Sequence, residues 1–282
     1  MTNSAPTPDL SHLPPLRDVI AFAQLDAKKS LGQNFLLDLN LTAKIVRAAG
    51  NLEGVNVIEV GPGPGGLTRP LVESAAASVT AIERDDRAVA ALQPLVLAAN
   101  GKLKLIPDDA LKADYLALAP APRAIVANLP YNIATPLLMG WLENITQFHS
   151  LTLMFQKEVA DRLVAPPSTS SYGRLSVITQ WVATAEKCLD LPPSAFTPPP
   201  KVNSSVVHLR PRPRTDEVAF KTMERITAAA FGQRRKMLRQ SLKSLGVPAE
   251  PLLEQAGIAG TARAEEIDVA GFVRLAQALN AA

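Results

Sequence analysis

The sequence contains little of what disulfide-stabilised, zinc-binding or membrane-spanning proteins need. Its 282 residues include one cysteine, Cys188, which has no partner within the chain for a disulfide. The three histidines lie far apart, and no Cys/His cluster has the spacing of zinc ligands. No stretch approaches the ~20 apolar residues that a membrane-spanning helix requires. We therefore expect a reduced protein with no metal and no membrane segment.

The N-terminal segment also lacks the features of a secretory signal. MTNSAPTPDLSHLPPLRD has no basic start followed by an apolar block. Its Pro, Ser and Thr content predicts a disordered extension over residues 1–15. The whole chain is 47% hydrophobic, enough for a sizeable core. These features predict a cytoplasmic protein.

Apolar segments alternate with helical patterns from residue 55 onward. Strands are predicted at 56–60, 78–83, 102–107, 124–129 and 151–156, which is typical of a parallel sheet covered on both faces. RLSVITQWVATAEKCLDL (174–191) and VNSSVVHLRPR (202–212) predict two longer antiparallel strands at the sheet edge. Beyond residue 212 the pattern is helical. We expect an α/β domain at 16–211 and a helical domain at 212–282.

A glycine-rich turn, GPGPGG, joins the first predicted strand to a helix. Gly61, Gly63 and Gly65 permit a sharp turn and a close backbone approach to a ligand. Gly61, Gly63 and Gly66 also satisfy G-x-G-x-x-G, so a dinucleotide site is a rival interpretation, and a turn without a ligand is another. Glu59 completes E-x-G-x-G-x-G, a pattern that suits a ligand with cationic ammonium and sulfonium groups better than a pyrophosphate.

Carboxylates follow the next two predicted strands. Glu83 stands about 20 residues after the loop, where it can accept hydrogen bonds from both ribose hydroxyls in either kind of nucleotide. Asp108 and Asp109 follow the third strand, and one of them can bind an adenine amine; a solvated turn is the alternative. All of these groups lie at carboxyl ends of strands, where open α/β sheets bind ligands.

The sequence Asn-Leu-Pro-Tyr (128–131) ends the fourth strand in the same row. The exocyclic amine of adenine is a poor nucleophile. The Asn128 side-chain oxygen and the Leu129 carbonyl can accept hydrogen bonds from its two N–H groups, which needs no titrating base. Pro130 holds the segment extended and removes a competing donor. The Tyr131 ring can stack on the base, a contact worth ~1–3 kcal/mol. An ordinary strand–loop turn is the alternative.

A second aromatic residue precedes three prolines in FTPPPKVNS. Phe196 can close the other face of the same base, because the prolines stiffen the loop that follows it. Alternatively, Phe196 is a hydrophobic plug beneath a Pro-rich loop.

Positive charge is concentrated near the C-terminus. Residues 201–246 carry eleven Lys and Arg against three Asp and Glu, a net charge of +8, whereas the whole chain carries +3. Such a patch is typical of RNA binding. QRRKMLRQSLK, with Arg234, Arg235, Lys236 and Arg239, predicts a helix that spans phosphates; a solvated helix face is the alternative.

Together these segments resemble the ribosomal RNA adenine N6-dimethyltransferase family, its small-subunit enzymes in particular. KSLGQNFL, VIEVGPGPGGLT, AIERD, DDAL, NLPYNIATPLL, FTPPPKVNSSVVHLRP and FGQRRKMLRQSLK match its motifs in order over residues 28–246. The resemblance implies an α/β, Rossmann-like class I methyltransferase sheet with a small all-helical C-terminal domain. It implies S-adenosylmethionine as the cofactor, with contacts at Asn34, Leu36, Gly61, Glu83, Asp109 and Asn128.

The implied reaction is dimethylation of the N6 amines of two adjacent adenosines near the 3′ end of small-subunit (16S) rRNA. The implied partner is an immature ribosomal subunit, and we expect a monomer. Three other functions stay open at this point. They are a large-subunit rRNA methyltransferase of the erythromycin-resistance type, an assembly factor whose main role is to bind immature rRNA, and a nicotinamide-dependent oxidoreductase.

Overall fold

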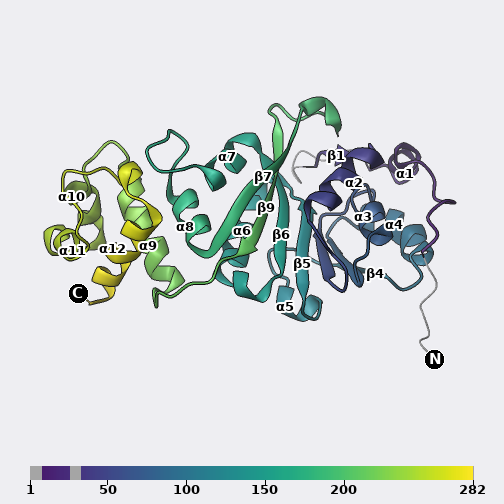
Figure 1. The fold of residues 1–282 in the computed structure, drawn as a ribbon. Coiled ribbons are helices and arrows are strands. Elements are labelled where there is room, and N and C mark those ends of the chain that lie inside the picture. The colour runs from purple at the N-terminus through teal and green to yellow at the C-terminus, as the bar shows by residue number, and fades with distance from the viewer. Residues whose placement is uncertain (1–7, 26–32, 282) are drawn as a thin grey trace. The chain divides into compact units, whose positions relative to one another are not determined.

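The structure, a computed structural model, describes residues 8–25 and 33–281 (Figure 1). It divides into two units, one formed by residues 1–160 and 186–210 and the other by residues 161–185 and 211–282. The sequence pattern predicts a single domain boundary at residue 212. Residues 161–185 belong with the C-terminal helices because helix α8 (Arg174–Val182) packs against α9 (Phe220–Gly232) and α12 (Val269–Ala281).

A seven-stranded sheet with the order β4-β3-β2-β5-β6-β9-β7 forms the centre of the fold. The strands are β2 (Asn56–Val60), β3 (Ser78–Glu83), β4 (Leu103–Pro107), β5 (Arg123–Asn128), β6 (Ser150–Gln156), β7 (Ala183–Leu191) and β9 (Ser204–Pro211). Strands β2 to β6 are parallel, and β9 runs antiparallel to β6. The five parallel strands confirm the predicted ones to within one residue at each end.

Burial explains why the parallel strands occupy the middle of the sheet. Strands β5 and β6 are buried at every residue except their last, and β2 at every residue except its first. Strands buried to this extent must be covered on both faces. Helices α3 (Thr68–Glu73) and α4 (Asp86–Ala98) pack on β3, and α6 (Tyr131–Glu143) packs on β6. Before α8, the described residues also form helices α1 (Leu16–Phe22), α2 (Leu39–Ala48), α5 (Tyr115–Leu118), η2 (Ile145–Gln147) and α7 (Lys157–Val164).

The segment 174–191 corrects the prediction of one long strand. Its first half is helix α8, and only its second half, β7, is a strand. Most of α8 is buried, namely Ser176, Val177, Ile178, Thr179, Trp181 and Val182. A helix buried nearly all round shows no amphipathic period, so its β-branched residues suggested a strand.

Two short strands that the sequence analysis missed join distant segments. β1 (Phe35–Leu36) pairs antiparallel with β8 (Phe196–Thr197), which follows the short helix η3 (Pro193–Ala195). Residues 8–15, expected to be disordered, form a loop whose Leu10 and Leu13 pack against the apolar core. The rest of that predicted extension, residues 1–7, lies outside the described residues.

The second unit is mainly helical and includes the start of β7 and the last residue of β9. In addition to α8, α9 and α12 it contains α10 (Leu238–Ser241), η4 (Leu242–Leu245), α11 (Ala249–Gln255) and η5 (Ala264–Glu266). Three aromatic rings form its centre, with centroids 6.0 Å apart for Tyr172 and Phe231 and 5.5 Å apart for Phe231 and Phe272. The Tyr172 hydroxyl donates to the Ile267 carbonyl at 2.9 Å, which satisfies the one polar group of this cluster.

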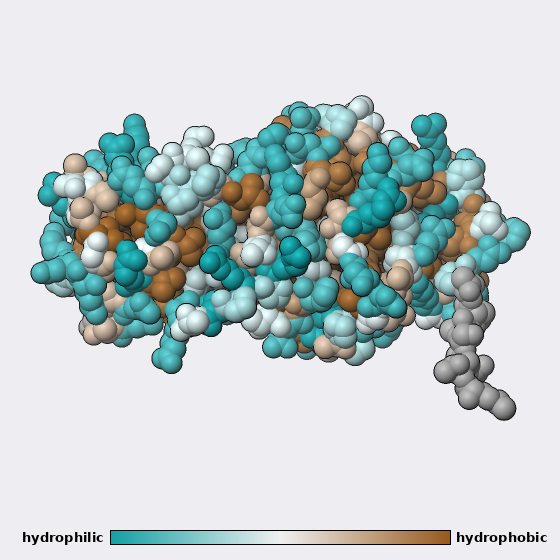
Figure 2. Space-filling view, viewed as in Figure 1, coloured by the Kyte–Doolittle hydropathy of each residue, from teal (hydrophilic) through white to brown (hydrophobic). Residues whose placement is uncertain are grey.

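Hydrophilic side chains cover most of the face shown in Figure 2 and separate the hydrophobic ones into small groups. None of the helices formed by residues 8–25 and 33–281 is both long and apolar enough to cross a membrane. Within the same ranges, no group of three or more His, Cys, Asp or Glu side chains is arranged to hold a metal ion.

Candidate active site

The strand order reverses between β2 and β5, the position at which open α/β sheets bind ligands. The glycine loop follows β2, and Asn128 is the last residue of β5. A Cβ placed on Gly61 would lie 3.6 Å from Cδ of Pro130, so the two turns are in contact. The parallel pairing of β2 with β5 therefore brings the glycine loop and residues 128–131 together.

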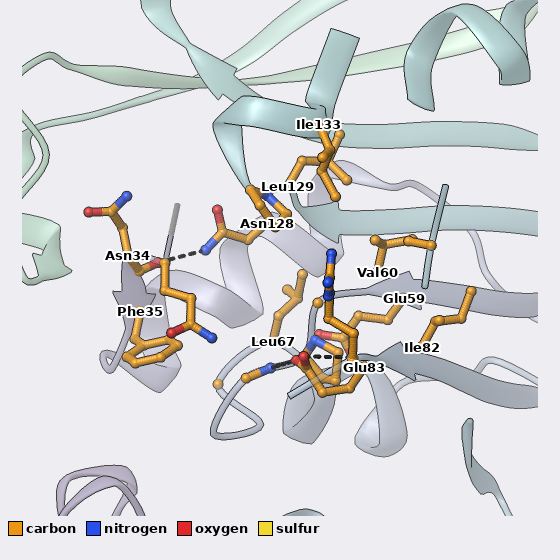
Figure 3. Close-up of a pocket in the computed structure, with 18 of the residues that line it drawn as sticks. Asn34, Phe35, Glu59, Val60, Leu67, Ile82, Glu83, Asn128, Leu129 and Ile133 are labelled. Carbon is orange, nitrogen blue, oxygen red and sulfur yellow. Dashed lines mark hydrogen bonds between the residues drawn. The ribbon is translucent and has the colours of Figure 1, made fainter. Parts of the chain in front are cut away.

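A pocket at this end of the sheet gathers side chains from segments far apart in the sequence (Figure 3). Its lining includes every predicted cofactor residue and the whole of residues 128–131: Asn34, Leu36, Glu59, Gly61, Gly63, Glu83, Asp109, Asn128, Leu129, Pro130 and Tyr131. Residues 29–32 of the predicted N-terminal motif lie outside the described residues. The pocket places these groups around one space, and the contact of each with a cofactor stays a prediction.

Phe35, a pocket residue that the sequence analysis missed, packs directly on the glycine loop. Gly63 has a φ of +53°, and a Cβ there would lie 2.9 Å from the Phe35 ring. A Cβ on Gly66 would overlap the carbonyl oxygen of Leu36. Both positions need glycine because the N-terminal strand β1 lies against them. The sequence could have identified Phe35 as a pocket residue, because it stands between the two predicted contacts Asn34 and Leu36.

Glu83 is held by backbone N–H groups on both carboxylate oxygens. Its Oε2 accepts from the Gly63 N–H at 3.2 Å, and its Oε1 accepts from the N–H groups of Arg84 and Asp85 at 2.9 Å each. Burial raises the pKa of Glu83 above its ordinary value, although these hydrogen bonds oppose the rise. The carboxylate is thereby fixed at the pocket wall, with lone pairs left to accept from a ligand.

Glu59 carries a buried carboxylate oxygen without a partner. Its side chain is 1% exposed, and Oε2 has no hydrogen bond within the part of the chain that the structure describes. Burial, with a smaller contribution from the negative charge of Glu83, raises the pKa of Glu59 to about 8, although the neighbouring Thr68 hydroxyl opposes the rise. A buried anion is costly unless it is paired, so this position favours a cationic ligand group.

Asp108 and Asp109 both line the pocket, after β4. The Asp109 carboxylate accepts from the Leu111 N–H at 3.1 Å, and its other oxygen lies 3.7 Å from the guanidinium of Arg84. Asp108 accepts from the Asp109 N–H at 2.7 Å. Both carboxylates stay within reach of a ligand, and Asp109, which is the less exposed of the two, is the one that the motif predicts.

The amide of Asn128 has a fixed orientation. Its Nδ2 donates to the carbonyl oxygen of Asn34 at 3.1 Å, as the dashed line in Figure 3 shows. An amide has one donor end and one acceptor end, so this bond decides which end is the oxygen. In Figure 3 the Asn128 oxygen lies on the side away from Asn34. The side chain therefore presents an acceptor to its surroundings.

Tyr131 begins helix α6 at the other end of this turn. Its phenol oxygen lies 2.7 Å from Oγ of Ser204, the first residue of β9. Burial raises the pKa of Tyr131, so the phenol stays neutral at physiological pH. A neutral, anchored ring fits a stacking surface and does not fit a general base.

The structure places Phe196 in the core, and its predicted role against a base stays a prediction. Phe196 is not part of the pocket lining, is only 3% exposed, and belongs to the core cluster that includes Leu36 and Val206. Its pairing opposite Leu36 turns the ring into the core. The alternative interpretation, a hydrophobic plug beneath the Pro-rich loop, describes where the structure places it.

Comparison with known proteins agrees with this geometry. The family described as ribosomal RNA adenine dimethylase matches residues 24–281. The chain belongs to this family. The Rossmann-like methyltransferase fold and the adenine dimethyltransferase activity predicted from the sequence are thereby confirmed, and the nicotinamide-dependent alternative is wrong.

Individual relatives of this adenine dimethylase cover nearly its whole length. It is 58% identical to the ribosomal RNA small subunit methyltransferase A of Azorhizobium caulinodans, over 97% of this chain and 95% of that protein. The protein of the same name from Paramagnetospirillum magneticum is 59% identical, over 96% and 97%. Among solved structures, a dimethyladenosine transferase from Plasmodium falciparum matches with a TM-score of 0.77 and 27% identity, over 88% of this chain and 98% of that chain. The 23S rRNA methyltransferase ErmE matches with a TM-score of 0.67 and 28% identity, over 88% and 100%.

The basic segment of this dimethylase is a turn rather than the predicted helix. Helix α9 ends at Gly232 and α10 begins at Leu238, so Arg234, Arg235 and Lys236 lie between them. Met237 forms a β-bridge with Arg263, and the Leu238 N–H donates to the Ala262 carbonyl at 2.8 Å. This extended pairing takes the backbone out of the helical conformation.

The four predicted RNA-binding residues differ in what they contact. Arg234 has its Nε 2.9 Å from a carboxylate oxygen of Glu265 and donates through Nη2 to the Thr169 carbonyl at 3.2 Å. All four residues are exposed. Arg234 differs in that its contacts tie the turn to the rest of the second unit. Their contact with RNA stays a prediction.

Proposed function

We propose that this enzyme transfers methyl groups from S-adenosylmethionine to the N6 amines of two adjacent adenosines near the 3′ end of small-subunit (16S) rRNA. The observation that carries the chemistry is the hydrogen bond from Asn128 to Asn34, which orients the amide for an exocyclic amine. The small-subunit target is supported by the relatives at 58% and 59% identity, against 28% for ErmE.

The pocket residues fit S-adenosylmethionine. The unpartnered Glu59 oxygen suits the cationic end of the cofactor, and the N–H-anchored Glu83 carboxylate suits the ribose hydroxyls. Asp109 suits the adenine amine, and the glycine loop lets the backbone approach the ligand. When bound, S-adenosylmethionine supplies an electrophilic methyl group carried on a sulfonium.

The residues of this chain then act on the target amine. The Asn128 oxygen and the Leu129 carbonyl accept hydrogen bonds from the two N–H groups of the target amine. These bonds direct the nitrogen lone pair out of the ring plane. Positive charge grows on that nitrogen as the new carbon–nitrogen bond forms, and preorganised neutral dipoles stabilise it without a titrating group. Each transfer would break the carbon–sulfur bond of the sulfonium, and the amine would release one proton to water for each methyl group that it gains.

Tyr131 supplies a flat surface for the base. Its ring starts helix α6 next to Pro130, and its hydroxyl is anchored on Ser204. Stacking of an extruded base on such a ring is worth ~1–3 kcal/mol. Because Tyr131 is half-buried, the stacked base would be partly shielded from water.

We propose that the substrate is an immature small subunit, that the enzyme acts as a monomer, and that it works in the cytoplasm, where that substrate is assembled. The exposed cations Arg235, Lys236 and Arg239 of the second unit then bind the RNA backbone. Their proposed role predicts an affinity that falls with salt.

Incubation of the protein with labelled S-adenosylmethionine and purified, undermethylated subunits tests this function. Nucleoside analysis should find N6,N6-dimethyladenosine in small subunits and no label in large subunits. The likeness to ErmE makes large subunits the informative comparison. Label confined to large subunits would overturn the proposed target, and no label in either would overturn the proposed function.

A further inference from the structure

Two buried polar atoms lie close together behind the glycine loop, and neither has a hydrogen-bond partner among the residues that the structure describes. They are Oε2 of Glu59, on β2, and Oγ1 of Thr68, the first residue of α3. Both residues are buried, and the Thr68 hydroxyl is near enough to Glu59 to lower the pKa of its carboxyl. Buried polar groups are nearly always hydrogen-bonded, so two such atoms side by side need an explanation.

The Thr68 hydroxyl serves neither its own helix nor the pocket surface. Two other buried threonines donate to a carbonyl one turn back, Thr42 to Leu39 at 3.2 Å and Thr227 to Met223 at 2.7 Å. No such bond is formed by Thr68 within the described part of the chain. The pocket lining includes Glu59 but not Thr68. The hydroxyl is therefore free to act on Glu59 from the side away from a ligand.

The protonation of Glu59 decides how strongly this hydroxyl can bind it. Because burial raises the pKa of Glu59 to about 8, its carboxyl is neutral at pH 7 in the cofactor-free protein. A cation next to Glu59 favours the carboxylate. A hydroxyl donates about twice as strongly to a carboxylate as to a neutral acceptor. The other ionisable side chains that line this pocket are Glu83, Arg84, Asp108, Asp109 and Tyr131.

We propose that Thr68 is a positioning residue for the cationic end of S-adenosylmethionine, and that its hydroxyl donates to the Glu59 carboxylate when that cation binds. This inference rests on the proposed function, which places the cationic end of the cofactor at Glu59. On binding, the Glu59 carboxyl releases its proton to water, and the carboxylate pairs with the cation on one side and with the Thr68 hydroxyl on the other. Thr68 acts on the cofactor only through Glu59.

Calorimetric titrations with S-adenosylmethionine and with 5′-methylthioadenosine test the proposal. The second probe keeps the adenine, the ribose and the sulfur, but it is a neutral thioether without the amino-acid part. At pH 6.5, Thr68→Val should raise the Kd for S-adenosylmethionine about 10- to 100-fold, the loss typical of one hydrogen bond to a charged group. The Kd for methylthioadenosine should be unchanged. Thr68→Ser, which keeps the hydroxyl, should bind both probes as the wild type does.

Proton release is a second readout, because Glu59 must ionise when the cation binds. Titrations of the wild type at pH 6.5, in two buffers that differ in ionisation enthalpy, should show release of about one proton with S-adenosylmethionine. An α-amino group of pKa ~7.7–8.0 is already charged at this pH and contributes little. Methylthioadenosine should release fewer protons, since it leaves Glu59 neutral. Equal proton release with the two probes would overturn the proposal.

Thr179 provides the matched control. It is a buried threonine on α8, in the second unit, and its Oγ1 also lacks a partner among the described residues. Thr179→Val should bind both probes as the wild type does. Thr68 has no role through Glu59 if Thr68→Val weakens both probes equally, or if Thr179→Val weakens S-adenosylmethionine as much as Thr68→Val does. A wild type that binds neither probe would refute the proposed cofactor, whereas a wild type that binds S-adenosylmethionine no better than Thr68→Val refutes this inference alone.

Discussion

The side-chain nitrogen of Asn128 donates to the carbonyl oxygen of Asn34 at 3.1 Å, across 94 residues of sequence. This bond joins the end of β5 to the segment just before β1, and both of these segments line the pocket. It leaves the amide oxygen as the group that can face a substrate. The chemistry that we propose for the enzyme depends on this orientation.

Asn128→Asp should lower kcat by roughly 100-fold or more, a cost of the size seen when one preorganised dipole is removed from an active site. Aspartate has nearly the same shape, but its carboxylate lacks the donor that holds Asn34 and is repelled by that carbonyl. Single-turnover methyl transfer with saturating cofactor measures the effect. Asn144→Asp is the control, because Asn144 also donates to a backbone carbonyl, that of Gly140, but lies outside this pocket. Comparable rates for the wild type and Asn128→Asp would contradict the proposed role.

Glu59 should make the stability of the cofactor-free protein depend on pH. Burial raises its pKa to about 8, whereas unfolding returns it to the ordinary 4.5. Between these values the folded protein keeps a proton that the unfolded chain loses, so the free energy of unfolding should fall as pH rises from about 4.5 to about 8. Glu59→Gln removes this titration and should flatten the profile.

Urea unfolding of the two proteins at pH 5 and pH 8 measures this difference. Groups far from Glu59 titrate alike in both proteins, so the difference between wild type and Glu59→Gln reports Glu59 and its coupling to Glu83. Glu53→Gln, at an exposed position, is the control and should follow the wild type. The assignment fails if Glu59→Gln and the wild type lose the same free energy between the two pH values.

Phe196 and Phe35 should respond to substitution in opposite ways. Phe196→Leu keeps an apolar core residue and should cost less than ~1.5 kcal/mol of stability without changing the KM for RNA. Phe196→Ala should cost about 3–5 kcal/mol, because it opens a cavity beneath β1. Phe35→Leu should instead weaken cofactor binding, because Phe35 lines the pocket. A raised KM for RNA in a stable Phe196→Leu variant would instead support the predicted stacking role.

The exposed cations of the basic turn should control how RNA affinity depends on salt. Arg235→Ala and Lys236→Ala should each reduce the slope of log K against log salt by roughly 0.7–0.9, the value for one lost phosphate contact. Arg234→Ala should mainly lower the Tm, because Arg234 is paired with Glu265. Filter binding at several salt concentrations separates the two effects. An unchanged slope in Arg235→Ala and Lys236→Ala would remove the turn from the RNA interface.

Most of the sheet and of the pocket could be predicted because their sequence signals are local. Parallel strands buried on both faces appear in the sequence as continuous apolar runs. Because the carboxyl ends of such strands share one edge of the sheet, the sequence alone predicts that Glu59, Glu83 and Asn128 lie together. The glycine pattern identified the loop, although it did not show that Gly63 and Gly66 are needed to admit Phe35 and Leu36.

The errors arose where distant contacts decide the local structure. Helix α8 is buried on nearly all sides, so it has no polar face to reveal its period. The basic helix is interrupted at Met237 by pairing with Arg263, a residue 26 positions later. The burial of Phe196 beside Leu36 could not be predicted, because its partner strand, β1, is only two residues long and carries no strand signal of its own.

The most direct test of the account is a crystal structure of the enzyme with a cofactor analogue and an oligonucleotide that contains the target adenosine. We predict that the N6 amine lies within hydrogen-bond distance of the Asn128 oxygen and the Leu129 carbonyl, with the base stacked on Tyr131 and the bond from Asn128 to Asn34 retained. An Asn128 oxygen directed away from the amine, or a base bound elsewhere in an active complex, would contradict it.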